Sequence, residues 1–102
     1  MANRGAPYLA EIIDILKQRK KELREKYQVI EISIFGSYVR NEQKESSDVD
    51  ILVEFEKTVS LLHIVALENH LCDILGLKVD VVPKKNIREE LKEFILREAV
   101  PV

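Results

Sequence analysis

The sequence predicts an α+β (mixed α/β) domain in which helices pack on a short mixed β-sheet whose first two strands are antiparallel. Segments with the helical period of apolar residues alternate along the chain with short β-branched segments. The connection between the first two of these short segments is too short to hold a crossover helix. With 102 residues, 46% of them hydrophobic, the chain has the size and the core of one domain, which we assign to residues 1–102.

The first helix is expected from Tyr8 to Tyr27, where apolar residues recur every three or four positions and Pro7 suits the first helical position. A strand follows from Gln28 to Phe35, because the pattern changes to alternation with β-branched and aromatic residues. This strand ends at Gly36-Ser37. The polar residues 38–47 leave room for one helical turn and a loop before the next strand.

The second strand is expected from Val49 to Phe55, and a helix from Ser60 to Leu75. Ser60 is suited to cap the start of that helix, and Gly76 is suited to end it. A third strand is expected from Leu77 to Val82, parallel to the second because a helix connects the two. A last helix is expected from Ile87 to Ala99. We expect this helix to bury four apolar residues, Ile87, Leu91, Phe94 and Ile95.

The balance of charges excludes some classes of partner. The chain has 16 Lys and Arg against 18 Asp and Glu, so the net charge of -2 provides no overall basic surface for nucleic acid or an anionic membrane. We therefore expect no direct contact with nucleic acid and none with a membrane. The one cysteine, Cys72, excludes an intramolecular disulfide, and no secretory or membrane-spanning segment is evident, so we expect a cytoplasmic protein.

Three of the five aspartates stand at strand positions, where aspartate is disfavoured. Asp48 and Asp50 are two residues apart at the start of the second strand, so both side chains point to the same face. In an antiparallel pair the end of one strand lies beside the start of the next, so Gly36-Ser37 meets these aspartates. Asp80, on the parallel third strand, completes a cluster of three carboxylates. Like charges persist together when a cation lies between them, and carboxylate oxygens suit Mg²⁺ or Mn²⁺.

Gly36 and Ser37 add a place for phosphate. A glycine after a strand lets the backbone approach a ligand closely, and a serine that opens a helical turn offers N–H groups and a hydroxyl. Each pattern alone is also typical of an ordinary turn, and Asp48-x-Asp50 alone is also typical of a solvated loop. Their combination at one edge of the sheet predicts a phosphate-binding turn beside a metal-binding cluster.

The spacing of these residues resembles a family signature. Gly36-Ser37, ten intervening residues and Asp48-x-Asp50 are similar to the GS-x10-DxD motif of the DNA polymerase beta-like nucleotidyltransferase superfamily. Asp80, on a short strand, resembles the third catalytic carboxylate of that superfamily. The resemblance implies that the mixed sheet and its helices form a small nucleotidyltransferase fold.

Further segments make the resemblance more specific. Ser37-x-x-Arg40, the strands Val-Asp-Ile-Leu-Val and Val-Asp-Val-Val-Pro, and the final Arg-Glu-Ala-Val are similar to the minimal nucleotidyltransferase (MNT) antitoxins of HEPN/MNT toxin-antitoxin pairs. The similarity covers about residues 30 to 100, which we take as the catalytic core. It implies a single minimal nucleotidyltransferase domain over residues 1–102.

The resemblance also implies a two-metal mechanism. Asp48 and Asp50 would hold two Mg²⁺ ions together with the triphosphate of ATP. Asp80 would bind the second metal ion and help to deprotonate the acceptor hydroxyl. Gly36 and Ser37 would bind phosphate oxygens. The acceptor would attack the α-phosphate in line, and pyrophosphate would leave.

The acceptor that the family implies is a tyrosine hydroxyl of a cognate HEPN ribonuclease toxin, which would receive AMP from ATP and form a hetero-oligomer with this chain. Arg40 or Lys44 would neutralise charge on the phosphates. Since 102 residues hold the catalytic sheet and its helices only, the acceptor must bring much of its own binding surface. Two alternatives remain open: a non-catalytic antitoxin that neutralises the toxin by binding it, and transfer to a small molecule such as an aminoglycoside.

Overall fold

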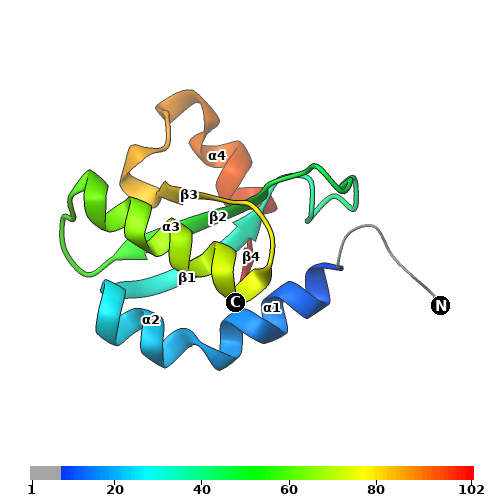
Figure 1. Ribbon diagram of the computed structural model, residues 1–102. Helices are drawn as coiled ribbons and strands as arrows, with labels where there is room; N and C mark the ends of the chain where they lie inside the picture. The colour runs from blue at the N-terminus through cyan, green and yellow to red at the C-terminus, as the bar shows by residue number, and fades with distance from the viewer. Residues whose placement is uncertain (1–7) are drawn as a thin grey trace.

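The computed structural model describes residues 8–102 (Figure 1). Its elements are α1 (Leu9–Gln18), α2 (Lys20–Tyr27), β1 (Val29–Phe35), β2 (Val49–Phe55), α3 (Leu61–Leu75), β3 (Val79–Pro83), the 3₁₀ turn η1 (Lys84–Asn86), α4 (Glu89–Glu98) and β4 (Val100–Pro101). Pro7, predicted as the first helical residue, lies outside the described residues. None of the helices between residues 8 and 102 has the length and hydrophobicity of a membrane-spanning segment.

The strands form one mixed sheet in the order β3-β2-β1-β4. β1 and β2 are antiparallel, and β2 and β3 are parallel, as their connections predict. β4 pairs antiparallel with the other edge of β1 and is a short strand that the sequence pattern does not predict. In the central register Phe35 pairs with Asp50, and Asp50 pairs with Asp80. The predicted fold class is therefore confirmed.

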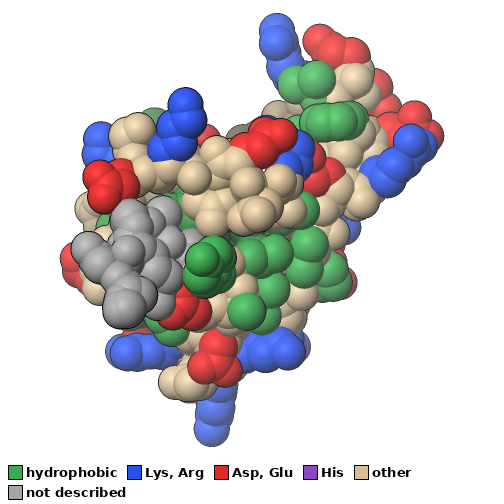
Figure 2. All heavy atoms as spheres, turned by 90° about the vertical axis from the view of Figure 1, so that its right-hand side faces the viewer, with side chains coloured by type: hydrophobic (Ala, Val, Ile, Leu, Met, Phe, Trp, Pro, Cys, Tyr) green, Lys and Arg blue, Asp and Glu red, His purple; other side chains and the backbone are tan. Residues whose placement is uncertain are grey.

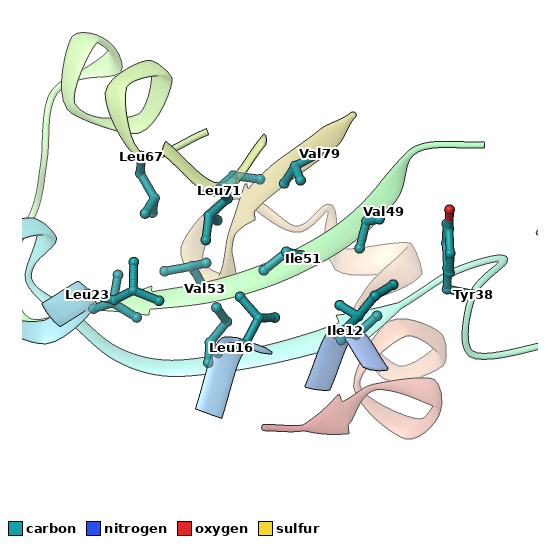
Figure 3. Packing of buried hydrophobic residues seen from close by; sticks show 14 residues of the cluster. Ile12, Leu16, Leu23, Tyr38, Val49, Ile51, Val53, Leu67, Leu71 and Val79 are labelled. Carbon is teal, nitrogen blue, oxygen red and sulfur yellow. The ribbon is translucent and has the colours of Figure 1, made fainter. Parts of the chain in front are cut away.

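One face of the sheet carries the hydrophobic core. Helices α1, α2 and α3 cover this face, and Figure 3 shows buried side chains of the helices beside those of the strands. The helices contribute Ile12, Leu16, Leu23, Leu67 and Leu71, and the strands contribute Val29, Ile32, Ile34, Val49, Ile51, Val53, Val79 and Val81. Burial of each such side chain contributes roughly 1.5–3 kcal/mol, so this face stabilises the sheet and leaves the other face available for chemistry.

Several local predictions are confirmed residue by residue. The second strand has the predicted bounds, Val49–Phe55. Helix α3 begins after Ser60, whose Oγ accepts a hydrogen bond from the His63 N–H at 3.1 Å. The helix ends at Gly76, whose φ of 68° lies in the left-handed region that favours glycine. The cap and the stop of α3 are thus both set by residues that the sequence identifies.

The single helix predicted from Tyr8 to Tyr27 is two helices. Arg19, with φ of -107° and ψ of 4°, ends α1 and begins α2. Its N–H donates to the Leu16 carbonyl at 3.0 Å, a shorter-range hydrogen bond than the one that repeats in an α-helix, and this tightens the last turn of α1. The break lies at neither Gly nor Pro, so the sequence pattern carries no sign of it.

Three other boundaries differ from the predicted ones. Gln28 ends α2 in a left-handed conformation, with φ of 59°, so β1 begins at Val29 instead of residue 28. β3 and α4 each begin two residues later than predicted, because residues 77–78 and 87–88 still belong to the connecting segments. β3 includes Pro83, and α4 ends one residue before the predicted position.

The prediction that the last helix buries Leu91 and Phe94 is wrong. Leu91 is 44% and Phe94 60% exposed, no residue of α4 is buried, and Ile87 and Ile95 are half-buried. Figure 2 shows hydrophobic side chains among charged ones on the projecting upper part of the molecule, where α4 lies in Figure 1. The physical reason is that α4 lies over the face of the sheet opposite the core, where polar residues such as Ser33 line the surface.

Replacing Leu71 with alanine is expected to lower the free energy of unfolding by roughly 2–5 kcal/mol, because this side chain is 0% exposed in the core. Urea unfolding followed by circular dichroism measures the change. The control is Leu62→Ala on the same helix, where the side chain is 80% exposed and the expected change is about 0.5 kcal/mol or less. Equal losses in the two variants would contradict the packing of α3 described above.

Candidate active site

The three predicted aspartates lie at one end of the sheet, on the face away from the core. Asp50 is the second residue of β2 and Asp80 the second residue of β3, and the two are partners in the parallel ladder. Residues paired in register point to the same face, so these two side chains are neighbours. Asp48 lies two residues before Asp50, and Val49, between them, is buried on the core face. Asp50 is half-buried, whereas Asp48 and Asp80 are exposed.

Gly36 lies directly against Asp50. It follows Phe35, the β1 partner of Asp50, and has φ of 85°. A Cβ atom at this position would overlap the Asp50 carboxylate, so glycine is required by the neighbouring side chain as well as by the backbone conformation. Ser37 comes next and is half-buried. The structure therefore brings the predicted glycine turn and the predicted carboxylates together.

The residues after Gly36 form the predicted helical turn. The N–H groups of Val39 and Arg40 donate to the Gly36 carbonyl at 3.0 and 3.2 Å. Tyr38 is 2% exposed and belongs to the core, so it anchors the turn. Burial, and then the charge of Asp48, raise the pKa of the Tyr38 hydroxyl. The tyrosine therefore stays protonated and acts through packing.

Glu98, at the end of α4, is a residue of this site that the sequence reasoning missed. Its Oε2 accepts a hydrogen bond from the Gly36 N–H, and its Oε1 accepts one from Arg40 Nη1, both at 2.7 Å. Arg40 Nε also donates to Glu42 at 2.9 Å. Arg40 is thus joined to the glycine turn, whereas Lys44, the alternative cation, lies further along the exposed loop. The one signal for Glu98 in the sequence is its place in Arg-Glu-Ala-Val.

The carboxylates at this end of the sheet act on one another. The pKa of Asp50 is raised to about 6, first by burial and then by the charges of Asp80 and Asp48. The positive charge of Arg40 lowers this pKa, and the negative charge of Glu98 raises it by a smaller amount. Unrelieved negative charge at a half-buried position is therefore a property of the site, and a bound cation would relieve it.

The donor atoms of this end of the sheet suit a divalent cation. Asp48, Asp50 and Asp80 supply carboxylate oxygens, which Mg²⁺ prefers, and the raised pKa of Asp50 reports the negative charge that such an ion neutralises. Within residues 8–102 no three His, Cys, Asp or Glu side chains converge as a preorganised metal site. The residues thus fit the ion by their chemistry, while their side chains do not form a rigid cage.

A groove of about 200 Å³ lies on the same face of the sheet. Ser33 and Leu52 form its floor, and Leu96 and Ala99 form the wall toward α4. Leu52 is two residues after Asp50 on the same face of β2, and none of Asp48, Asp50 and Asp80 lines this groove. A further groove of about 180 Å³ lies at the far end of β2, away from the aspartates.

Comparison with known proteins gives the class of the protein. Residues 16–102, which include the glycine turn, the three aspartates and Glu98, match the family of nucleotidyltransferase domains. The chain belongs to this family, and the prediction of a nucleotidyltransferase is confirmed. The match extends over all four strands and begins in the last turn of α1.

A curated relative defines the family more narrowly. The chain is 53% identical over 94 residues to protein adenylyltransferase MntA of Thermococcus cleftensis, and the alignment covers 92% of this chain and 95% of that protein. This chain thus belongs to the protein adenylyltransferase branch of the nucleotidyltransferases, as the resemblance to MNT antitoxins implies.

Solved structures share the fold. One assigned as a minimal nucleotidyltransferase has a TM-score of 0.73 and 33% identity, covering 89% of this chain and 95% of that chain. Another, a tri-AMPylated Shewanella oneidensis HEPN toxin in complex with an MNT antitoxin, has a TM-score of 0.66 and 22% identity, covering 88% of this chain and 70% of that chain. The implied minimal nucleotidyltransferase fold is therefore confirmed.

Replacing Gly36 with alanine is expected to destabilise the protein more than the same change at Gly76. Both glycines have positive φ, which costs an alanine roughly 1–2 kcal/mol. A Cβ at Gly36 also displaces the Asp50 carboxylate, whereas a Cβ at Gly76 meets no atom within 4 Å. Overpacking adds about 1–3 kcal/mol at Gly36, which chemical unfolding will measure. Equal losses would show that Gly36 does not need to be small.

The raised pKa of Asp50 predicts how stability depends on pH in the absence of metal. The folded protein holds the Asp50 proton more tightly than the unfolded chain does, because an unfolded aspartate has a pKa of about 3.9. The wild type therefore loses stability as the pH rises from about 4 to about 6. Asp50→Asn removes this loss, so above about pH 6 the variant should be more stable than the wild type by about 1 kcal/mol. This value is smaller than the free energy that the whole change in pKa would give, because Asp50 is partly exposed and solvent screens its charge.

Thermal unfolding at several pH values tests this dependence. At about pH 4 the wild type and Asp50→Asn should unfold at nearly the same temperature, since the side chain at position 50 is then neutral in both folded proteins. Asp73→Asn, at an exposed position of α3, is the matched control and should follow the wild type. A stabilisation by Asp50→Asn that does not change with pH would contradict an origin in ionisation.

Proposed function

We propose that this protein is an antitoxin that transfers AMP from ATP to a tyrosine hydroxyl of a cognate HEPN ribonuclease toxin in the cytoplasm. Membership of the protein adenylyltransferases supports the proposal, as does the likeness in fold to an antitoxin held in complex with an AMPylated HEPN toxin. The main structural support for the proposal is the register of the sheet, which brings Asp50 beside Asp80 and Gly36 against Asp50. Carboxylates and a phosphate-binding turn at one place suit nucleotidyl transfer.

The three aspartates would share the work of binding and proton transfer. Asp48 and Asp50 would hold Mg²⁺ with the triphosphate, and Asp80 would take part in binding the second ion. When bound, the two ions neutralise phosphate charge and favour the deprotonated acceptor hydroxyl. Asp80 is exposed and lies beside the half-buried Asp50, so we assign to its carboxylate the role of receiving the hydroxyl proton.

The turn that begins at Gly36 would hold the phosphates. The Gly36 N–H already donates to Glu98, so we assign the phosphate contacts to Ser37 and Arg40, and to Gly36 the close packing against Asp50. A guanidinium has five N–H donors, and the contacts to Glu98 and Glu42 use one nitrogen each. Arg40 therefore keeps donors for phosphate oxygens while it is held in place.

The tyrosine oxygen forms a bond to the α-phosphorus of ATP, and the bond from that phosphorus to the oxygen bridging the α- and β-phosphates breaks. Pyrophosphate leaves with the electron pair, and the proton of the hydroxyl passes to the base. The acceptor would approach the aspartates from the open face of the sheet, where Asp48 and Asp80 are exposed. The toxin, held in a hetero-oligomer, would supply the rest of the binding surface.

Incubation with the cognate toxin, ATP and Mg²⁺ is expected to add AMP to the toxin, as measured by intact-protein mass spectrometry. Asp48→Asn and Asp50→Asn should each slow this transfer by about 100-fold or more, because loss of a metal-binding carboxylate removes the charge compensation of the triphosphate. Asp73→Asn, exposed on α3, is the control and should transfer at the wild-type rate. Treatment with a chelator should stop transfer by the wild type.

The alternatives give different outcomes in the same experiment. A binding-only antitoxin would leave the toxin unmodified, and Asp50→Asn would still neutralise it. Transfer to an aminoglycoside would release pyrophosphate when the antibiotic is present and the toxin is absent. An unmodified toxin after incubation with the wild type would refute the proposed function.

A further inference from the structure

Glu98 joins the end of α4 to the glycine turn. Its carboxylate accepts two hydrogen bonds of 2.7 Å, one at each oxygen, from the Gly36 N–H and from Arg40 Nη1. These donors are 62 and 58 residues away in the sequence. The side chain is 12% exposed, so water competes weakly for the two bonds. Short hydrogen bonds to a charged acceptor are the stronger kind in proteins.

The register of the sheet places Glu98 at the turn. β4 pairs with β1 so that Ile34 lies opposite Val100. Continuing this antiparallel register by two residues brings Gly36 opposite Glu98. The position of the carboxylate therefore depends on the pairing of β4 with β1. Burial of α4 does not determine it, because no residue of that helix is buried.

Gly36 is held from several sides at once. Its N–H donates to Glu98, and its carbonyl accepts from the N–H groups of Val39 and Arg40. The same glycine packs against the Asp50 carboxylate. A shift of the turn therefore changes the spacing between Arg40 and Asp50, which are the phosphate side and the metal side of the proposed nucleotide site.

We propose that Glu98 is a positioning residue for nucleotide binding. By bonding Gly36 and Arg40 together, it holds the phosphate-binding turn at the spacing from Asp50 that a nucleoside triphosphate requires. The inference rests on the proposed function, because it takes this turn as the triphosphate site. Glu42, the other carboxylate bonded to Arg40, is exposed, whereas Glu98 also accepts from the Gly36 N–H and therefore joins the arginine to the turn.

Titration with a nonhydrolysable ATP analogue and Mg²⁺, without toxin, measures this effect directly. Glu98→Ala is expected to raise the Kd of the analogue about tenfold or more, as loss of a residue that orients a ligand-binding group does elsewhere. Glu98→Gln should give an intermediate Kd, because its amide oxygen still accepts from Gly36 while its NH₂ cannot accept from Arg40. Glu93→Ala, 87% exposed on the same helix, is the matched control and should bind as the wild type does.

A double variant separates positioning from a general loss of structure. In an Arg40→Ala background, Glu98→Ala should raise the Kd by a clearly smaller factor than in the wild type, because one of the two groups that it positions is gone. A purely structural role would give the same factor in both backgrounds. Unfolding midpoints check that each variant is folded, and Glu98→Gln keeps the test decisive if Glu98→Ala does not fold.

The outcomes are distinct. Wild-type affinity in both Glu98→Ala and Glu98→Gln would overturn the inference. Tighter binding by Glu98→Ala would overturn it too, because the carboxylate would then compete with phosphate for Arg40 and Gly36. A wild type that binds no analogue would instead overturn the proposed function itself.

Discussion

The pairing of β2 with both of its neighbours is the interaction on which the rest of this structure depends. β2 lies between β1 and β3, antiparallel to the first and parallel to the second. Because side chains alternate between faces along a strand, β2 buries Val49, Ile51 and Val53 against the helices and presents Asp50 on the open face. A single strand therefore carries the centre of the core and the centre of the candidate site, and the burial of one face fixes the register of the other.

The carboxylates on the open face of the sheet lower the stability of the fold, and the hydrophobic core on the opposite face compensates for this loss. The pKa of Asp50, about 6, means that burial and the neighbouring carboxylates disfavour its charged form near neutral pH. On the opposite face of the same strands, α1, α2 and α3 bury large apolar side chains such as Leu16 and Leu71. A cation bound between the carboxylates would relieve their repulsion, so its binding would stabilise the fold. Glu98 adds a fourth carboxylate but is held by Gly36 and Arg40.

The parts of the fold that the sequence predicted have local causes. The Ser60 cap and the Gly76 stop act on residues within one helical turn of themselves, and the bounds of β2 follow from its own β-branched run. The break at Arg19 has no such cause, since arginine is an ordinary helix-forming residue. The exposure of Phe94 was also mispredicted, because an amphipathic pattern states which face of a helix would be buried and does not state whether an apolar surface is there to receive it.

By itself the sequence determined that the glycine turn meets the aspartates at the candidate site. The types and the spacing of Gly36, Asp48 and Asp50 suffice, because the two-residue period of a strand and a short antiparallel connection bring them together. Tertiary structure alone decided the part played by Glu98, which is one of 13 glutamates and stands 62 residues from Gly36. The physical reason is that side-chain periodicity acts between neighbours along the chain, whereas the hydrogen bond from Gly36 to Glu98 requires β4 to pair with β1, which happens only when the sheet has formed.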